Sequence, residues 1–421
     1  MARKMKDSGI EWIGEIPEGW SIARGKHILT LLQRAVFPTD GVITCFRDGE
    51  VTLRSNRRED GFTVSLKEIG YQGIEPGDLV VHGMDGFAGS IGISDSRGKS
   101  SPVLVVLDSS QDKKYLMYYL RSMAYNNVFL ALSTGIRVRS CDLKWNKLAD
   151  LLYLVPPIVE QHKLVSFLAE KCSEIDAMLS KTRASIEEYK KLKQAVITQA
   201  VTKGVRGERE MKDSGVEWIG EIPKEWICEK IKYATSISRG LFNHRPRNDE
   251  RYYNGKYPFI QTGDVANATK YIVSYSQTLN ELGKTVSKEF PKGTLTMTIA
   301  ANVGDVAILN FDAYFPDSVV GFIPNKNIRT LYLFYVFSAM KDEFTRTAIK
   351  STQLNLNIDR VKETFIPVTL NVNEQCEIEN YLESKCAEID GLIAKKEQLV
   401  KELESYKKSL IYEVVTGKRE V

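Results

Sequence analysis

Residues 160–204, "EQHKLVSFLAEKCSEIDAMLSKTRASIEEYKKLKQAVITQAVTKG", occur twice in related form, because residues 374–418 read "EQCEIENYLESKCAEIDGLIAKKEQLVKELESYKKSLIYEVVTGK". The two copies align without a gap at an offset of 214 residues, so that Glu174 corresponds to Glu388. Both are rich in Lys, Glu, Leu and Ala, and Gly391 is the one glycine in either main run. Each copy is therefore predicted to form one long helix.

Apolar residues recur along both predicted helices at alternating steps of three and four, the heptad pattern of a coiled coil. The expected helix-pairing seam consists of Ile175, Met178, Tyr189, Leu192 and Val196 in the first copy, and of Ile389, Leu392, Leu399, Leu403, Tyr406 and Leu410 in the second. Thr182, Ser185 and Lys396 interrupt it. A narrow apolar seam needs a similar helix as its partner, and the matched register favours pairing between the two copies. Two unrelated amphipathic surface helices remain the alternative.

A second duplicated segment precedes each unit. "MKDSGIEWIGEIPEGW" at residues 5–20 returns as "MKDSGVEWIGEIPKEW" at residues 211–226, with thirteen of sixteen positions identical. The chain thus consists of two tandem units, each with this motif, a variable region and a long helix. The expected domains are 1–156, with the first motif and variable region, then the helix 157–206, then 207–367 with the second motif and variable region, and the helix 368–421.

The two variable regions predict short strands separated by Gly and Asp turns, as in "GDLVVHGM" (77–84) and "TLTMTIAANVGDVAILN" (294–310). One helix is expected late in each region, over 112–132 and over 328–349. The predicted fold class is α+β, with two globular α/β domains, two long helices paired as an antiparallel coiled coil and a pseudo-two-fold internal repeat.

Composition limits the possible functions. The chain has 421 residues and a formal net charge of +4, so basic residues that bind nucleic acid must be clustered rather than numerous. The four histidines and six scattered cysteines, without a C-x-x-C pair, argue against a zinc site or a redox dithiol. The sequence starts without an apolar signal region and has no apolar stretch long enough to span a membrane. The expected location is the cytoplasm, with no membrane contact.

The order of motif, variable region and helix, written twice, resembles the specificity (S) subunit of Type I restriction–modification enzymes. The resemblance covers essentially the whole chain and is carried by "KDSGIEWIGEIPEGW" and its copy, "VPPIVEQ", "KCSEIDAML" and "KCAEIDGLI", "YPFIQTGDV", and the endings "AVTKG" and "VVTGK". It implies that each variable region is a target recognition domain for half of a split DNA sequence. It further implies two methyltransferase (M) subunits as partners, with restriction (R) subunits bound through them.

The resemblance also implies a non-catalytic subunit without a cofactor. The sequence agrees, because the single Pro-Pro, in "VPPI", does not form the [Asp/Asn]-Pro-Pro-aromatic motif of an amino-methyltransferase, and "GISDSRGKS" (92–100) has the wrong spacing for a phosphate loop. ATP, S-adenosylmethionine and magnesium chemistry is expected in partner chains. Two alternatives stay open, namely a stand-alone pseudo-dimeric DNA-binding protein and an enzyme with an unrecognised active site.

Polar and basic residues on loops of the variable regions are the candidates for DNA contact, since Arg reads guanine, Asn and Gln read adenine, and Lys and Ser/Thr mostly bind phosphates. The candidates in the first region are Arg54, Asn56, Arg57, Arg58, His82, Lys99, Arg137 and Arg139. Those in the second are Arg239, Asn243, His244, Arg245, Arg247, Gln261, Thr262, Lys350, Thr352, Gln353 and Asn355. Solvated loop residues are the alternative for each.

The repeated motif is expected to serve the common scaffold. Identical residues cannot encode two different half-sites, so Trp12, Trp20, Trp218 and Trp226 are interpreted as scaffold anchors rather than base-stacking platforms. This explains why the chain carries the motif twice.

Overall fold

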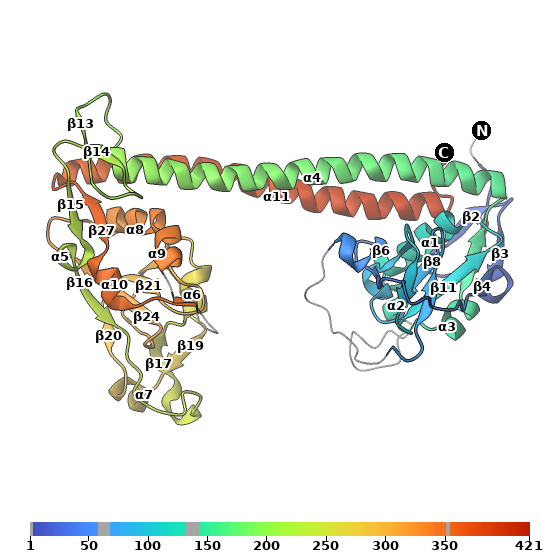
Figure 1. Cartoon of the computed structure of the whole chain (residues 1–421), viewed down its shortest axis with the longest axis horizontal. Helices are drawn as coiled ribbons and strands as arrows, with labels where there is room; N and C mark the ends of the chain where they lie inside the picture. The colour runs from blue at the N-terminus through green and yellow to red at the C-terminus, as the bar shows by residue number, and fades with distance from the viewer. Residues whose placement is uncertain (1–2, 58–67, 132–142, 348, 351–353) are drawn as a thin grey trace. The chain divides into compact units, whose positions relative to one another are not determined.

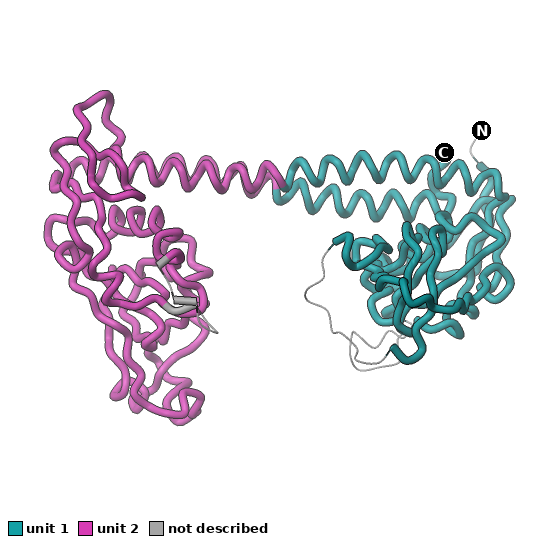
Figure 2. The backbone as a smooth tube through the Cα atoms, viewed as in Figure 1, with its two compact units in different colours: residues 1–183, 397–421 teal, residues 184–396 magenta. Residues whose placement is uncertain are grey.

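A computed structural model describes residues 3–57, 68–131, 143–347, 349–350 and 354–421. The chain forms two compact units (Figure 2), one of residues 1–183 with 397–421 and the other of residues 184–396. Two long helices contribute to both: α4, Ile158–Lys203, and α11, Val372–Val415. Each unit combines sheets, short helices and its part of these two helices (Figure 1), so the fold class is α+β, as predicted.

The first unit is built on a four-stranded antiparallel sheet in the order β4-β11-β8-β9, with bounds Leu29–Leu31, Leu104–Ser109, Leu79–His82 and Ile91–Ile93. Four two-stranded pairs accompany it: β1 (Met5–Asp7) with β2 (Glu15–Pro17), β3 (Ser21–Arg24) with β12 (Leu152–Val155), β5 (Ile43–Cys45) with β6 (Val51–Leu53), and β7 (Gln72–Ile74) with β10 (Gly98–Ser100). Its short helices are α1 (Lys113–Tyr125), α2 (Val128–Ala131) and α3 (Trp145–Asp150), with 3-10 turns η1 (Gly25–His27), η2 (Arg54–Asn56) and η3 (Gly86–Ala88).

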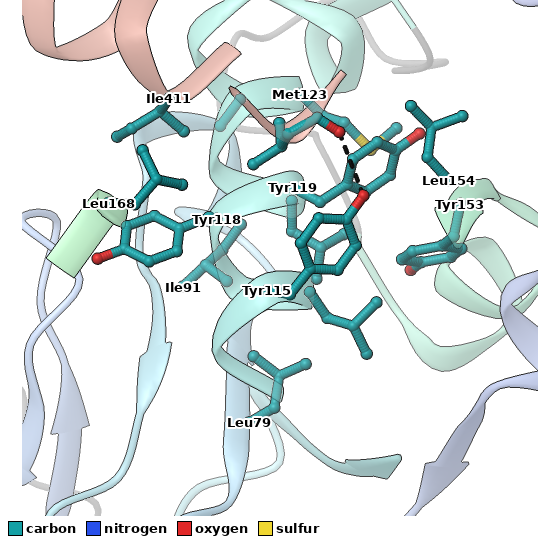
Figure 3. Close-up of a cluster of buried hydrophobic side chains, with 14 of the residues drawn as sticks. Leu79, Ile91, Tyr115, Tyr118, Tyr119, Met123, Tyr153, Leu154, Leu168 and Ile411 are labelled. Carbon is teal, nitrogen blue, oxygen red and sulfur yellow. Dashed lines mark hydrogen bonds between the residues drawn. The ribbon is translucent and has the colours of Figure 1, made fainter. Parts of the chain in front are cut away.

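The core of the first unit joins the sheet to the long helices (Figure 3). Tyr115 and Tyr119 of α1 are fully buried and pack in one cluster with Leu168 of α4 and Ile411 of α11. The Tyr115 hydroxyl donates to the backbone oxygen of Val415 at 3.2 Å. The ends of both long helices are therefore part of this unit's hydrophobic core, which fixes them to the sheet without a separate linker.

The second unit has two sheets. One is β16-β24-β21-β22-β18, with bounds Thr235–Arg239, Val319–Pro324, Leu295–Thr298, Val306–Leu309 and Tyr271–Ile272; the other is β19-β17-β23-β20, with bounds Gln277–Leu279, Tyr253–Phe259, Ala313–Tyr314 and Glu289–Phe290. Strands β13 (Met211–Asp213) and β14 (Glu221–Pro223), β15 (Ile227–Lys230) and β27 (Phe365–Val368), and β25 (Ile349–Lys350) and β26 (Leu354–Asn355) form pairs. Its short helices are α5 (Ile231–Ala234), α6 (Thr262–Asn267), α7 (Glu281–Thr285), α8 (Thr330–Ala339), α9 (Lys341–Thr347) and α10 (Ile358–Glu363), with the 3-10 turn η5 (Glu250–Tyr252).

The helices expected over 112–132 and 328–349 are each divided in two. The first breaks between α1 and α2, where Asn127 adopts a φ of 58°, which an α-helix does not allow. The second breaks at Met340, which ends α8 with a ψ of 4° before α9 begins. Neither break involves a proline or glycine, so composition did not reveal it.

Within each unit the segments of α4 and α11 run antiparallel, as predicted. Lys407 pairs with Asp176 at 2.6 Å in the first unit, and Lys193 pairs with Asp390 at 2.7 Å in the second. These ion pairs are equivalent under the 214-residue offset, because Lys407 corresponds to Lys193 and Asp390 to Asp176. The coiled coil thus reproduces the pseudo-two-fold repeat of the sequence.

At four positions the residue that faces the partner helix lies one place later in the sequence than the predicted seam residue. Ile175, Ile389 and Leu410 are buried, and Tyr189, Val196, Leu392 and Leu403 are partly buried. Met178, Leu192, Leu399 and Tyr406 are instead exposed, at 53%, 48%, 43% and 49%. The less exposed position lies one residue later in each case, at Leu179, Lys193, Val400 and Lys407. The two lysines concealed this phase, because each contributes an aliphatic stem to the seam and extends its ammonium group to an aspartate.

Candidate nucleic-acid interface

The first cluster of candidate residues follows β6 in the turn η2. Arg54 Nε donates to Thr44 Oγ1 at 3.3 Å, and Asn56 Nδ2 donates to Thr52 Oγ1 at 2.9 Å. Arg57 pairs with Asp48 at 2.6 Å and lies 4.2 Å from the centre of the Phe46 ring. The Arg57 contact lowers the pKa of Asp48 against the opposing effect of burial. The structure therefore brings these three candidates together on one turn.

His82 and Lys99 are held by local contacts. His82 Nδ1 accepts from the backbone N–H of Met84 and of Asp85, at 3.3 and 3.0 Å, and burial lowers the pKa of this imidazole. Nδ1 therefore acts as an acceptor at the end of β8. Lys99 pairs with Glu68 at 2.6 Å, and its side chain is 16% exposed. Both side chains are engaged in contacts within the domain, which favours a structural role over direct reading of bases.

The second unit gathers three predicted arginines around one aspartate that sequence reasoning missed. Arg247 Nη2 donates to both carboxylate oxygens of Asp317, at 2.6 and 2.7 Å. Arg245 Nη2 is 3.8 Å from Asp317 Oδ2, and Arg239 Nε donates to the Asp317 backbone oxygen at 2.5 Å. We call these four residues the arginine array. Asp317 lies about 70 residues from the arginines in the turn "FPDS", which reads as an ordinary turn and carries no signal of this role.

Neighbouring residues hold the loop of the arginine array in place. The His244 ring stacks on Tyr252 at 4.0 Å between centroids, and its Nε2 lies 3.0 Å from Asp249 Oδ2. Hydrogen bonds from the side chain and the backbone N–H of Arg251 lower the pKa of Asp249. Asn243 is exposed, and its backbone N–H donates to Val286 at 3.0 Å. His244 is thus bound to its own loop, whereas the Asn243 side chain faces solvent.

The remaining candidates lie elsewhere in the second unit. Gln261 Nε2 donates to Gln277 Oε1 at 2.9 Å, and Thr262 begins α6. Lys350 and Asn355 belong to the paired strands β25 and β26. Arg58, Arg137, Arg139, Thr352 and Gln353 lie outside the described residues.

The repeated motif lies where each unit meets the long helices. Trp20 and Trp226 are buried at 1% and 0% exposure. The Trp12 backbone oxygen accepts from the Tyr412 hydroxyl of α11 at 3.0 Å, and Trp218 Nε1 donates to the Phe365 backbone oxygen at 3.3 Å. Each tryptophan has packing or hydrogen-bond contacts inside the protein, which supports the interpretation as scaffold anchors.

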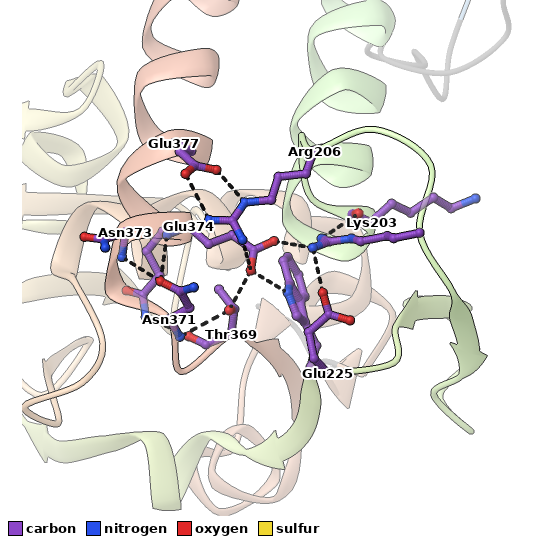
Figure 4. A network of polar contacts seen from close by, with 11 residues as sticks. Lys203, Arg206, Glu225, Thr369, Asn371, Asn373, Glu374 and Glu377 are labelled. Carbon is purple, nitrogen blue, oxygen red and sulfur yellow. Dashed lines mark hydrogen bonds and ion pairs between the residues drawn. The ribbon is translucent and has the colours of Figure 1, made fainter.

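A polar network surrounds the start of α11 (Figure 4). The Glu374 side chain, 1% exposed, accepts hydrogen bonds from Arg209 at 2.6 Å, from Trp226 Nε1 at 3.2 Å and from Thr369 Oγ1 at 3.1 Å. A carboxylate in the first turn also interacts favourably with the positive end of the helix dipole. The motif, the sheet and the long helix are joined at this one residue.

Other kinds of site are restricted in the described part of the chain. There, no group of three or more His, Cys, Asp or Glu side chains is arranged to hold a metal ion. Cys45, Cys172, Cys228, Cys376 and Cys386 are free thiols, and burial raises the pKa of Cys45 to about 12. Within the described ranges no helix is long and apolar enough to cross a membrane.

Comparisons with known proteins match this architecture. The Type I restriction modification DNA specificity domain matches residues 240–402. A relative over nearly the full length is the putative type I restriction enzyme MjaX specificity subunit of Methanocaldococcus jannaschii, 23% identical over 96% of this chain and 95% of the relative. The chain is thus similar over nearly its full length to a Type I specificity subunit. The EcoKI specificity subunit of Escherichia coli is a further relative, 24% identical over 54% of this chain and 51% of its own length.

Solved structures share the fold of this chain. A chain from a structural study of complex assembly and conformational transition in the type I R-M system has a TM-score of 0.74 at 14% identity, covering 96% of this chain and 99% of that one. The HsdS subunit from Thermoanaerobacter tengcongensis has a TM-score of 0.51 at 14% identity, covering 96% and 98%. The fold is thus shared over nearly all of this chain, although the sequences are only 14% identical.

Proposed function

We propose that this specificity subunit is the DNA-recognition component of a Type I restriction–modification complex. It binds a bipartite, asymmetric double-stranded DNA target, one half-site for each recognition domain, and docks two M subunits, with R subunits attached through them. The observation that carries the proposal is one scaffold present twice with different polar loops, η2 in the first unit and the arginine array in the second. A reader of two different half-sites needs this combination.

The division of labour follows the repeat. Residues 1–156 and 207–367 act as the recognition domains, and the helices 157–206 and 368–421 join them and set the distance between half-sites. The subunit itself performs no chemistry and binds no cofactor, and it works in the cytoplasm, where chromosomal DNA is accessible. Arginine, asparagine and glutamine side chains on the loops supply the hydrogen bonds that distinguish base pairs in the major groove.

The test is methylated-motif sequencing in cells that express the full chain with its cognate M subunit. We expect a motif of two different half-sites with a gap of about 5–8 base pairs, the spacing that places both domains on one face of the duplex. Deleting four residues from each long helix removes about one turn and should shorten the gap by about one or two base pairs. An unchanged gap contradicts the role of the helices in spacing.

A stand-alone pseudo-dimeric DNA-binding protein is the alternative. Purified chain with and without the M subunit separates the two, because the proposal requires a stoichiometric complex between them. Specific DNA binding by the chain alone, without complex formation, supports the alternative. Cleavage or methylation of DNA by the chain alone contradicts both.

A further inference from the structure

The arginine array is organised around Asp317. Its carboxylate is bound by Arg247 through both oxygens at 2.6 and 2.7 Å, and Arg245 Nη2 lies 3.8 Å from one of them. Its backbone oxygen accepts from Arg239. Guanidinium groups repel each other and lose considerable rotamer freedom when fixed, so a shared carboxylate is a physical means of holding them together.

The backbone around the arginine array is closely packed, so its geometry is fixed on both sides. A Cβ at Gly240 would lie 2.2 Å from the Pro316 oxygen and 2.5 Å from the Phe315 oxygen, so the close approach of these segments requires glycine. The Leu241 N–H donates to the Phe315 oxygen at 3.0 Å. On the other side of the loop, the Tyr253 hydroxyl donates to the Arg247 backbone oxygen.

The arginine array keeps positive charge and open donors at the surface. Two guanidinium groups lie at the Asp317 carboxylate and a third donates to its backbone oxygen, so the arginine array holds three positive charges and one negative. The side chains of Arg245 and Arg247 are 56% and 48% exposed. Arg245 Nη1 donates to the backbone oxygens of Phe242 and His244, both at 2.8 Å. Within the described residues, Nε of Arg245 and Nε and Nη1 of Arg247 have no hydrogen-bond partner. Arg245 keeps the Nε and Nη2 edge, whose two parallel donors match the O6 and N7 acceptors of guanine, and Arg247 keeps single donors on either side of its Asp317 contact.

We propose that Asp317 is the positioning residue that orients Arg245 and Arg247 to read guanine in the half-site of the second recognition domain. This inference rests on the proposed function and names one of its specificity determinants. Asp317 does not contact DNA itself. It fixes the rotamers of the two arginines before binding, so that less conformational entropy is lost when they meet the bases.

The experiment is selection from a randomised DNA duplex library by the full complex with the M subunits, followed by sequencing of the bound fraction at two salt concentrations. The variants are Asp317→Asn, which keeps the size and the backbone acceptor but removes the charge, Asp317→Glu, which restores it, and Arg245→Ala and Arg247→Ala. Asp359→Asn is the control, because it removes an equal charge from an ion pair with Lys362 on α10.

We expect Asp317→Asn to lower the preference for guanine at the position read by Arg245 or Arg247 by about tenfold, the low end for a bidentate base contact. The arginine variants relax the same position, and Asp317→Glu recovers part of the preference. Affinity of Asp317→Asn for non-target DNA rises, because a negative charge near the phosphates is lost. The first half-site stays unchanged, and Asp359→Asn retains both half-sites. Base preference at the other positions of the second half-site is retained in Asp317→Asn, which shows that the second unit is folded.

Three outcomes would overturn the inference. In the first, the arginine variants relax a position that Asp317→Asn leaves intact. In the second, Asp317→Asn weakens selection of both half-sites equally, and in the third it changes affinity for DNA without any change in base preference, as loss of a phosphate contact does. Failure of the proposed function looks different, because the wild-type complex then selects no sequence in either half.

Discussion

The junctions between motif and long helix differ between the two repeats although their sequences are nearly the same. In the second unit Glu374 is buried and accepts from Arg209, Trp226 and Thr369. In the first unit the corresponding Glu160 is 24% exposed and pairs with Arg3 at 2.5 Å. Trp20 Nε1, the counterpart of the Trp226 donor, is buried and has no hydrogen-bond partner among the residues that the structure describes.

The difference shows how one duplicated motif can be stabilised in two ways. The arginine lies over the tryptophan ring in both units, at 5.5 Å for Arg3 and 5.4 Å for Arg209. The position that corresponds to Thr369 is Pro156, because Gln161 donates to the Pro156 backbone oxygen as Gln375 does to that of Thr369, and proline has no hydroxyl to donate. The second junction therefore depends on a buried charged network, whereas the first depends mainly on apolar packing.

The largest expected effect comes from removing the carboxylate at each junction. Glu374→Ala leaves the buried donors of Trp226 and Thr369 without their acceptor, while Arg209 keeps its bonds to Glu225 and to the Lys203 backbone oxygen. It should lower the free energy of unfolding by about 2–3 kcal/mol. The matched variant Glu160→Ala removes a more exposed ion pair and should cost about 1 kcal/mol. Urea denaturation of both variants measures the difference, and equal losses would show that the junctions are energetically alike.

Replacing the two buried tryptophans isolates the hydrogen bond. Trp226→Phe and Trp20→Phe remove the same volume, but only Trp226→Phe removes a donor that Glu374 uses. The loss of unfolding free energy should thus be about 1–2 kcal/mol greater for Trp226→Phe. Thermal denaturation of the pair provides the measurement, and a greater loss for Trp20→Phe contradicts the structural comparison.

The coiled coil predicts equal effects in the two units. Lys193→Glu places like charges opposite Asp390, and Lys407→Glu does the same opposite Asp176, so each should lower the unfolding free energy by about 1 kcal/mol. Adding Asp390→Lys or Asp176→Lys should restore most of that loss in a double-mutant cycle. Unequal couplings, or no coupling, would indicate that the ion pairs do not contribute to the antiparallel register.

Glycine at position 391 is a smaller difference between the two long helices. A Cβ built at Gly391 meets no atom within 4 Å, and the corresponding residue in α4 is Ala177. Gly391→Ala should raise the unfolding free energy by about 0.5–1 kcal/mol, and Ala177→Gly should lower it by a similar amount. Circular dichroism melts test both changes, and a loss of stability in Gly391→Ala would reveal a contact with another chain or a need for flexibility.

The smallest expected effect concerns acid stability of the second unit. Hydrogen bonds from Lys230 and Lys232 lower the pKa of Glu363 to about 2. The folded protein then keeps this carboxylate charged where the unfolded chain takes up a proton. The contribution of Glu363 to the free energy of unfolding is fully present above the ordinary pKa of a glutamate and is lost as the pH falls toward 2. Glu363→Gln should flatten the decline of stability between about pH 5 and pH 2, and an unchanged slope would contradict the pKa shift.

The sequence by itself determined the architecture. Two copies of a helix without internal proline, two copies of a tryptophan motif and two strand-rich variable regions were enough to predict tandem units, an α+β fold and an antiparallel helix pair. Duplication supports this inference, because two helices that carry the same apolar seam can each cover the seam of the other. The same argument identified the loops that differ between repeats as the candidates for DNA contact.

Only the tertiary structure decided the phase of the helix seam and the surroundings of the arginines. Steps of three and four from Ile175 or Ile389 fit two phases that differ by one residue, and the lysines in the true seam reveal themselves only when Asp390 and Asp176 are seen opposite them. Asp317 joins Arg245 and Arg247 because β23 and β24 bring its turn beside β16 and the loop that follows. Contacts between segments far apart in the chain depend on the folded sheet, and no local pattern of residues encodes them.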